Sequence, residues 1–573
     1  MSASGRDDYS EWIRLYDTLT GENRAQLRAL AETLPDKPLI SVVMPVYNPS
    51  PKWLIEAIES VRGQIYPHWE LCIADDASTD KAIRPILERY AKKDRRIKII
   101  IRETNGHISA ASNSALSLAS GGWIALIDHD DLLAEQALFR VAEAINRNPG
   151  LRLIYSDEDK ISENGRRFDP YFKCDWNMDL FFSQNMISHL GAYNAALVRE
   201  LGGFREGLEG SQDYDLALRC VERMEPGQIR HIPRILYHWR AHAESTAQDM
   251  NAKPYAYQAG KKALDEHFIR EGVNASAELL DCGMYRIRYA LPDAPPLVSL
   301  IILTRNQQKL LEACIKSILN RTSYSNYEIL IIDNGSDDAA ALQGLKQLQG
   351  NPRIRVVADG RPFNFSALNN AAVKLARGEV VGLLNNDLEV ISPGWLSEMV
   401  SHALRPGVGC VGARLLYSDE TLQHGGVVLG VGGVAGHAHK HLPCFMHGYF
   451  GRARLIQSFS AVTAACLVIR KSLYEKVEGF NELALQLAYN DIDFCLRVGE
   501  AGYRNIWTPY AELYHHESAT RGSEDTPEKQ ARFSKEVQYM MQHWGDKLLN
   551  DPSYSPNLTL KHEDFSLAWP PRV

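Results

Sequence analysis

Short apolar runs rich in β-branched residues alternate along the chain with segments of helical periodicity. The runs SVVMPVYN, from Ser41, and SLIILTRN, from Ser299, are typical of buried strands. Each is followed by a segment with the apolar spacing of an amphipathic helix, WLIEAIESVRGQIY in one case and ACIKSILNRTSY in the other. Alternating strands and helices predict right-handed crossovers and a mostly parallel sheet, with ligands bound at the carboxyl ends of the strands. We therefore predict the α/β fold class.

The pattern occurs twice. The two apolar runs are 258 residues apart, and so are the next strand-like segments, LCIADDAST and ILIIDNGSD. Late in each half QDYDLALR matches NDIDFCLR at a separation of 278 residues, and the tetrapeptide YSDE and the tripeptide LYH also recur. A nearly constant separation over several ordered motifs indicates a duplicated module. Because the separation grows by about 20 residues, we expect an insertion in the second half, at His424–Pro443.

The repeat and its flanks divide the chain into five predicted parts. A chain of 573 residues is too long for one hydrophobic core, since single cores stop growing at about 250–300 residues. The predicted parts are a helical N-terminal extension (1–37), a first α/β module (38–249), a linker (250–296), a second module (297–522) and a C-terminal extension (523–573). In the last part, KQARFSKEVQYMMQHWGDKLL is typical of an amphipathic helix, which would pack on the second module or dock on a membrane surface or partner.

Composition narrows the class of protein. The formal net charge of -8 argues against a nucleic-acid-binding protein, which would carry a basic footprint. The longest apolar runs, such as Phe459–Ile469, are shorter than the roughly 18 residues that a membrane-spanning helix needs. The N-terminal residues lack the apolar stretch of a signal peptide, and the nine cysteines include no C-x-x-C pair. We therefore expect a cytoplasmic protein, which could meet a membrane lipid at the inner face of the cytoplasmic membrane.

Acidic and amide side chains end the second strand of each half. A carboxylate or amide in such a turn can pair with the edge of a pyrimidine base, although the same residues would also suit a turn closed by an Asx hydrogen bond. Two asparagines at matching positions of the following helical segments are further candidates. The candidate nucleotide-binding residues are Asp75, Asp76, Asn113, Asp333, Asn334 and Asn370.

A denser acidic cluster, DHDD, follows the apolar run WIALI. Three carboxylates within four residues repel one another unless a cation is present, and Mg²⁺ or Mn²⁺ would relieve this repulsion and bridge to a diphosphate. The alternative for the last of them is a helix N-cap. The second half keeps one carboxylate, in NND, and histidines late in each half could add a metal or phosphate ligand. The candidate metal ligands are Asp128, Asp130, Asp131, His238 and His242 in the first half, and Asn385, Asp387 and His515 in the second.

One aspartate in each half, Asp213 and Asp491, opens an amphipathic helix. Such a residue can cap the helix and offset its dipole. It can also project into a cleft at the strand ends and act as a general base.

The order of these motifs resembles a known family. VVMPVYN, ADDAST, DHDD and an acidic pair before a helix are similar to inverting family-two glycosyltransferases of the GT-A fold, over about residues 38–245 and again over about 296–522. In the second half NFSALNNAA, LLNNDLEV, LQHGGVVLG and NDIDFCLRVGEAGYRNIW resemble bacterial rhamnosyltransferase-like enzymes that build O-antigen, capsule or other surface glycans. The resemblance implies two tandem GT-A modules.

The resemblance also implies roles for the candidate residues. Asp76, with Asp75 beside it, and Asp333 would contact the nucleotide base. The metal would be held by Asp128 and Asp130 in the first half and by Asp387 in the second, where Asn385 replaces the first aspartate of the D-x-D motif. Asp213 and Asp491 would be the catalytic bases, although the family's preceding glutamate is Gln212 in one half and Asn490 in the other.

The implied reaction is a single inverting displacement. The base takes the proton of the acceptor hydroxyl while that oxygen attacks the anomeric carbon, and Mn²⁺ or Mg²⁺ carries the charge of the departing nucleoside diphosphate. The implied donor is a dTDP- or UDP-linked sugar, with rhamnose favoured by resemblance alone. The implied acceptor is a growing surface glycan or a lipid-linked oligosaccharide.

Three functions remain open at this point. Both modules could be active and add two linkages. One could be catalytic and the other an acceptor-binding scaffold. The protein could instead be a nucleotidyltransferase or a non-catalytic nucleotide-sugar-binding protein, but the chain lacks the G-x-x-x-x-G-K-[ST] phosphate loop.

Overall fold

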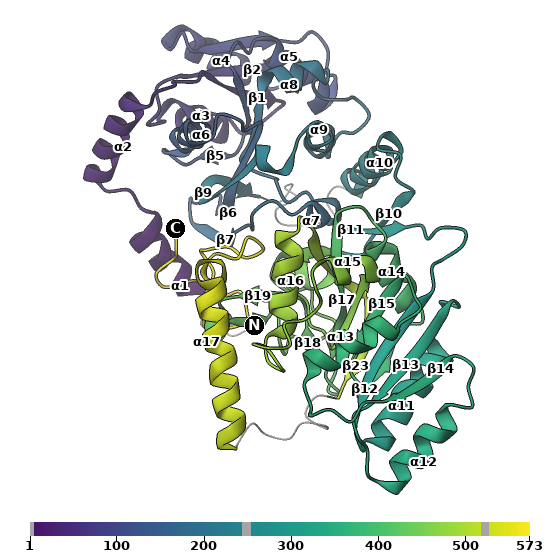
Figure 1. The fold of residues 1–573 in the computed structure, drawn as a ribbon. Helices are drawn as coiled ribbons and strands as arrows, with labels where there is room; N and C mark the ends of the chain where they lie inside the picture. Colours follow the sequence, from purple (N-terminus) through teal and green to yellow (C-terminus); the bar gives the residue numbers. More distant parts are fainter. Residues whose placement is uncertain (1–4, 243–253, 517–525) are drawn as a thin grey trace.

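The computed structural model describes residues 5–242, 254–516 and 526–573, and it contains two large mixed sheets, one in each half of the chain (Figure 1). The first sheet has the path β3 (Ile97–Ile101), β2 (Trp69–Asp75), β1 (Ile40–Val46), β4 (Trp123–Leu126), β8 (Gly191–Asn194), β6 (Leu153–Ser162), β9 (Ile229–Ala241) and β5 (Leu132–Leu133). The second has the path β14 (Ile354–Ala358), β13 (Tyr327–Asp333), β12 (Val298–Thr304), β15 (Val380–Leu384), β22 (Cys466–Arg470), β17 (Val408–Leu416), β23 (Arg504–His515) and β16 (Leu388–Val390).

The two paths are equivalent strand by strand. In each half the first four strands of the path are parallel, and the fifth, β8 or β22, is antiparallel to its neighbours. The predicted α/β class with two tandem modules is therefore confirmed, in the form of two mixed sheets whose leading strands are parallel.

Successive residues of β1 face opposite sides of the first sheet. Val42 belongs to one hydrophobic cluster with Leu54 and Leu138, whereas Val43 belongs to another with Ala115. Because helices cover both faces, the strand is apolar on both sides except for the buried Ser41, rather than alternating. The helices concerned are α3 (Pro51–Arg62), α5 (His107–Ser117) and α6 (Ala137–Arg147).

The second half carries extra structure between β17 and β22. Its strands β19 (Val427–Leu429) and β20 (Ala435–His437) form a separate two-stranded sheet and fall inside the predicted insertion. The repeated tetrapeptide YSDE, in contrast, is not equivalent in the two halves. Its first copy, Tyr155–Glu158, lies within β6, and its second, Tyr417–Glu420, follows the end of β17. The prediction that the two copies of YSDE match is therefore wrong.

The segment predicted as a linker contains a helix and a hairpin. Helix α10 (Pro254–Arg270) and the paired strands β10 (Ala275–Leu279) and β11 (Tyr285–Tyr289) share a hydrophobic cluster with Tyr214 of the first module. The predicted boundaries at 249–250 and 522–523 lie outside the described residues.

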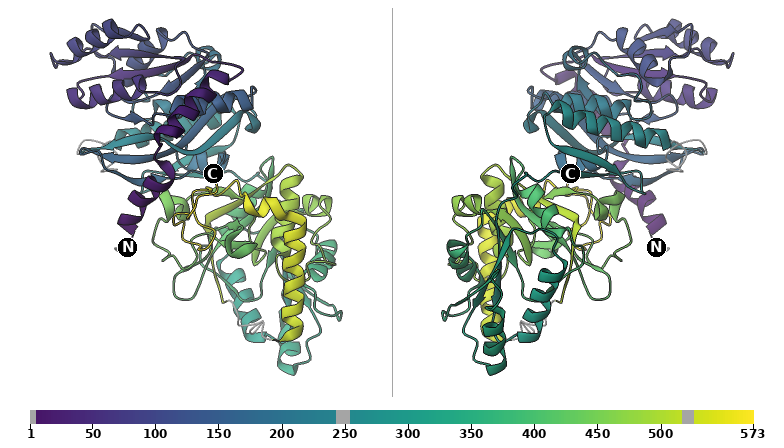
Figure 2. Two further views of the ribbon diagram at one scale, coloured as in Figure 1. Left: turned by 90° about the vertical axis from the view of Figure 1, so that its left-hand side faces the viewer. Right: turned by 90° about the vertical axis from the view of Figure 1, so that its right-hand side faces the viewer.

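The two ends of the chain meet at the junction of the modules. Helix α17 (Pro527–Leu549) lies along the second module and buries Met540, Trp544 and Leu548 there (Figure 2). After α17 the chain returns to the first module, where the Trp12 indole of helix α1 (Gly5–Trp12) donates to the Ala568 carbonyl at 3.1 Å. No helix among the described residues has the length and apolar content to cross a bilayer.

A buried ion cluster joins the modules. Asp179 of α7 (Met178–Ser183) lies 2.7 Å from the Arg405 guanidinium and 2.7 Å from that of Arg504, both in the second module. Burial alone would raise the pKa of Asp179, but the two guanidinium groups outweigh it and hold that pKa well below its usual range. The carboxylate is therefore ionised wherever the protein is folded near neutral pH.

We expect Asp179→Asn to lower the free energy of unfolding by about 3 kcal/mol, because it leaves two partly buried guanidinium groups without their carboxylate. Since the folded-state pKa is depressed, this stabilisation is present above about pH 4 and is lost as the pH falls below that value. Urea unfolding near neutral pH and in acid measures both effects. The control Asp169→Asn breaks the more exposed pair with Lys160 and should change stability by less than about 1 kcal/mol. Equal stability of Asp179→Asn and wild type near neutral pH would contradict this account.

Candidate active site

The acidic turn after β4 holds one deeply buried carboxylate. Asp131 is 1% exposed, and it accepts hydrogen bonds from the Tyr237 hydroxyl at 2.5 Å and from the Arg240 main-chain N–H at 2.7 Å. Burial raises the pKa of Asp131 well above its usual value, and the neighbouring charges of Asp130 and Asp128 raise it further. The turn therefore concentrates negative charge that a cation would relieve.

A histidine from a distant loop completes a cluster with this turn. The ligand atoms of Asp128, Asp131 and His189 all lie within 4.8 Å of one another. The His189 ring stacks on Tyr237, with 4.4 Å between ring centroids, and Tyr237 also bonds Asp131. Two carboxylates and one imidazole are ligand types that fit a divalent metal such as Mn²⁺. Sequence reasoning missed His189, because no matching motif in the second half marks it.

The other predicted ligands of the first half divide into two groups. The His242 Nε2 atom lies 3.0 Å from an Asp130 carboxylate oxygen, directly beside the cluster. His238 lies apart from it, with its Nδ1 atom 2.6 Å from the Asp159 carboxylate. Along β9 it is the preceding residue, Tyr237, that reaches Asp131, so the geometry gives a metal role for His238 no support.

The predicted base of the first half is bonded to the loop that carries His189. Asp213 lies in the first turn of α9 (Gln212–Val221), and the Asn185 amide donates to its carboxylate at 2.8 Å. Burial raises the pKa of Asp213, nearby His189 opposes this rise, and the charge of Asp128 adds to it. Asp128 and His189 therefore lie close enough to Asp213 to act on its pKa.

The predicted nucleotide residues of the first half hold the local chain. Asp75 accepts from the Ser78 N–H at 3.2 Å, as an Asx-type turn requires. Asp76 accepts from the Gly106 N–H at 3.0 Å and pairs with Arg102 at 2.7 Å. The strand ends at these residues lie on the same sheet edge as the acidic turn, because β2, β1 and β4 are parallel neighbours.

Asn113 has a similar structural place. Its amide donates to the Phe204 carbonyl and accepts from the Phe204 N–H, both at 2.8 Å. Asn370 repeats this arrangement with the main chain of Phe480 at 2.9 Å. The two asparagines therefore occupy matching positions because each makes the same contact between a helix and a loop. A role in nucleotide binding for either one stays a prediction.

The nucleotide candidates of the second half also form internal bonds. Asp333 accepts from the Ser336 N–H at 3.0 Å, and the Asn334 amide donates to the Asp359 carbonyl at 2.9 Å. The turn after β13 thus copies the turn after β2. Its role in base recognition remains untested.

The second half brings together Asp387, Asn385 and His515. The His515 Nε2 atom lies 3.2 Å from an Asp387 carboxylate oxygen and 3.1 Å from the Asn385 amide nitrogen. Among the residues that the structure describes, no set of three histidine, cysteine, aspartate or glutamate side chains converges here as in the first half. The predicted base Asp491 opens α16 (Asn490–Glu500), and its carboxylate accepts from the Ala464 N–H at 3.0 Å.

Comparison with known proteins identifies the family. The model for "Glycosyl transferase family 2" matches residues 41–202 and 299–477, which is more than half of the chain. The chain belongs to glycosyl transferase family 2. The matched ranges include the acidic turn and His189 in the first half and Asp387 in the second, whereas Asp213 and Asp491 lie outside them.

The family 2 chain has long relatives. The uncharacterized protein y4gI of Sinorhizobium fredii is 52% identical over 572 residues, which are 100% of this chain and 63% of that protein. The O-antigen biosynthesis protein RfbC of Myxococcus xanthus is 36% identical over 564 residues, which are 98% of this chain and 43% of RfbC. This chain thus spans less than two thirds of each relative. A solved mannosyltransferase of Pyrobaculum calidifontis in complex with GDP-Man and Mn²⁺ is 17% identical, covers 45% of this chain and 66% of its own, and has a TM-score of 0.33.

The family 2 site carries an acid whose ionisation opposes folding. Because the folded-state pKa of Asp213 is raised, ionising it costs stability as the pH rises through that pKa, and there is no cost below the unfolded-state value of about 4. In the absence of divalent metal, we expect Asp213→Asn to be more stable than wild type above neutral pH. The two proteins should converge in acid. Urea unfolding with EDTA across this range tests the direction, and a variant less stable than wild type at high pH would refute it.

Proposed function

We propose that the first module is a metal-assisted inverting glycosyltransferase in which Asp213 is the general base. The observation that carries this proposal is that Asn185, in the loop that carries His189, bonds the Asp213 carboxylate, while His189 itself clusters with Asp128 and Asp131. A base next to a candidate metal site is what an inverting transfer from a nucleoside diphosphate sugar needs.

The residues of this module have distinct tasks in the proposed reaction. Asp213 takes the proton of the acceptor hydroxyl as that oxygen attacks the anomeric carbon from the face opposite the leaving diphosphate. Its raised pKa increases its affinity for this proton, and the Asn185 amide orients the carboxylate. Mn²⁺ or Mg²⁺ held by Asp128, Asp131 and His189 would stabilise the charge on the diphosphate. Asp76 and Asp75, at the end of β2 on the same sheet edge, would contact the nucleotide base in this proposal.

We extend the proposal to a second transfer in the second module. Its strand path is equivalent, and Asp387, Asn385 and His515 occupy the corresponding strand ends. Asp491 is the base in this proposal. Because this half has one carboxylate beside His515, we propose a weaker dependence on metal than in the first module.

The alternative is that the second module binds acceptor without catalysis. One observation favours it: the Asp491 carboxylate already accepts two main-chain N–H groups, from Ala464 at 3.0 Å and from Ile492 at 2.9 Å. A carboxylate whose oxygens are already engaged by two main-chain donors is less free to accept the proton of an acceptor hydroxyl.

We propose a bacterial surface glycan, free or lipid-linked, as the acceptor. The support is the relative named for O-antigen biosynthesis, with which this chain shares 36% identity over nearly its whole length. The proposed donors are UDP- or dTDP-linked sugars, with rhamnose suggested by the second-half motifs. A lipid-linked acceptor would require the protein to work at the inner face of the cytoplasmic membrane.

Release of nucleoside diphosphate from UDP- and dTDP-sugars with Mn²⁺ tests the activity. We expect Asp213→Asn to reduce kcat for one linkage by at least about 100-fold, which is the usual contribution of a general base. Asp491→Asn should reduce the other linkage and leave the first unchanged. The control Asp293→Asn replaces an exposed aspartate of the linker and should retain both activities.

Each outcome separates the candidate functions. Full transfer by Asp213→Asn would rule out Asp213 as the base. If Asp491→Asn alters neither linkage, the second module is a scaffold. If no nucleoside diphosphate is released from any donor while the nucleotide sugars still bind, the protein is a nucleotide-sugar-binding protein rather than a transferase.

A further inference from the structure

Strand β6 carries three consecutive buried acids that the proposed reaction does not use. Asp157, Glu158 and Asp159 are 0%, 6% and 1% exposed. Buried carboxylates are unfavourable unless each has its own donors, so their partners indicate what the strand holds in place. The strand at the same place in the second sheet, β17, has the sequence VGCVGARLL and no acidic residue. The acidic run is therefore specific to the first module.

The middle acid forms an ion pair around the main chain of His189. The Lys173 ammonium, whose side chain is fully buried, lies 3.0 Å from the Glu158 carboxylate and donates to the His189 carbonyl at 2.6 Å. The same Glu158 oxygen accepts from the His189 N–H at 2.9 Å. Both main-chain polar groups of this candidate metal ligand are thus held by one buried pair.

The loop that carries His189 depends on such support. Ser188 has a φ of 41°, a left-handed conformation that is unfavourable for a residue other than glycine. Lys173 also donates to the Ile187 carbonyl at 2.7 Å. The loop includes Asn185, which orients the base Asp213. Holding this loop therefore fixes a metal ligand and a partner of the base together.

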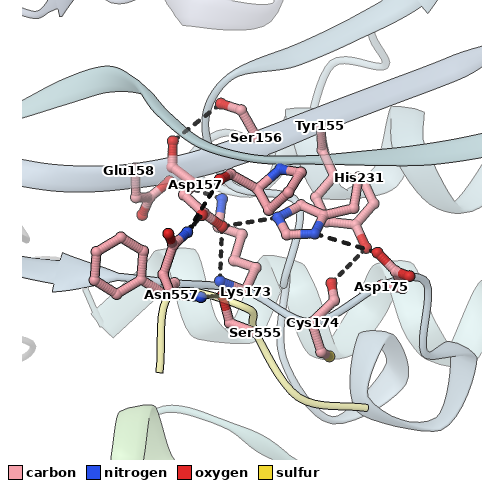
Figure 3. Close-up of polar contacts among 12 residues, drawn as sticks. Tyr155, Ser156, Asp157, Glu158, Lys173, Cys174, Asp175, His231, Ser555 and Asn557 are labelled. Atoms are coloured by element: carbon pink, nitrogen blue, oxygen red, sulfur yellow. Dashed lines mark hydrogen bonds and ion pairs between the residues drawn. The ribbon is translucent and has the colours of Figure 1, made fainter. Parts of the chain in front are cut away.

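The C-terminal segment reaches this network from the second module (Figure 3). The Asn557 amide donates to the Asp157 carboxylate at 3.0 Å, and Asp157 also accepts from the Lys173 N–H at 2.8 Å and from His231. Nearby in the same segment, the Ser553 carbonyl accepts from Arg452 of the second module at 2.9 Å. Asn557 thus connects to His189 through Asp157 and Lys173: Asp157 holds the main chain of Lys173, and the side chain of Lys173 holds the His189 carbonyl.

We propose that the Glu158–Lys173 pair and Asn557 are positioning residues that hold His189 against Asp128 and Asp131, so that the C-terminal segment packed on the second module completes the cation site of the first. This inference rests on the proposed metal site of the first module. Groups that orient a metal ligand commonly change metal affinity by about 10- to 100-fold when removed.

Mn²⁺ binding to the full chain provides the test, measured by the electron paramagnetic resonance signal of the free ion. Measurements in an Asp387→Asn background remove the carboxylate of the second module. We expect the double variant Glu158→Gln/Lys173→Met, which leaves no unpaired buried charge, to weaken Mn²⁺ binding by about tenfold. Asn557→Ala should weaken it in the same direction and by a smaller factor. The control Lys160→Met removes a lysine of the same strand whose partner is the exposed Asp169, and should bind Mn²⁺ like its parent.

A double-mutant cycle separates positioning from general damage. If these residues act through His189, their variants should cause no further loss of Mn²⁺ affinity in a His189→Ala protein. An equal loss with and without His189 would overturn the inference, and so would unchanged affinity in folded variants. Asn557→Ala changes a single side chain of the C-terminal segment and leaves the Glu158–Lys173 ion pair intact. It therefore provides the test if the double variant does not fold.

Hydrogen exchange without metal keeps the inference apart from the proposed function. Amides of residues 185–190 should exchange faster in Asn557→Ala and in the double variant than in wild type, whether or not metal binds. Unchanged exchange would overturn the positioning role even if Mn²⁺ binds. If the wild-type protein does not bind Mn²⁺, or if Asp128→Asn leaves Mn²⁺ binding unchanged, the proposed metal-assisted reaction is wrong. The hydrogen-exchange result does not depend on that outcome.

Discussion

The accumulation of buried negative charge at one sheet edge is the constraint on which the first module depends. Asp131 and Asp213 both have raised pKa values, and the charge of Asp128 contributes to each rise. The hydrogen bonds to Asp131 described above come from a tyrosine hydroxyl and a main-chain N–H, which are neutral. Neutral donors orient these carboxylates without cancelling their charge. A divalent cation would cancel it, and this is why we interpret the site as a place for a metal diphosphate.

The acidic turn that follows the fourth parallel strand differs between the two halves. Leu126 and Leu383 are equivalent, since they pair with matching residues of β1 and β12, yet the next strand begins at Leu132 in one half and at Leu388 in the other. The turn is thus one residue shorter in the second half. By its place before that strand, Asp387 corresponds to Asp131 rather than to Asp130. Its contact is also different: His515 reaches it, whereas Tyr237 reaches Asp131.

Local sequence predicted the strand-end motifs well because parallel strands bring their carboxyl ends to one edge. The α/β class, the duplication and the region of the insertion followed from periodicity and spacing. His189 could not be found this way, because its loop is held by Lys173 and Glu158 through contacts that no periodic pattern records. The repeated motif also does not record the contact that His238 makes. Its recurrence in LYH suggested a metal ligand, but strand β9 directs the side chain to Asp159.

The modules do not behave as independent units joined by a linker. Asp179 of the first module is neutralised by two arginines of the second, and the Ser183 hydroxyl donates to the Ile456 carbonyl at 3.0 Å. On the other side of the junction, Asn557 bonds Asp157 while its segment packs on the second module. Because buried polar contacts have strict geometric requirements, these bonds fix the orientation of one sheet relative to the other. The distance between the two strand-end sites is then a property of the fold, and an acceptor that used both would have to span it.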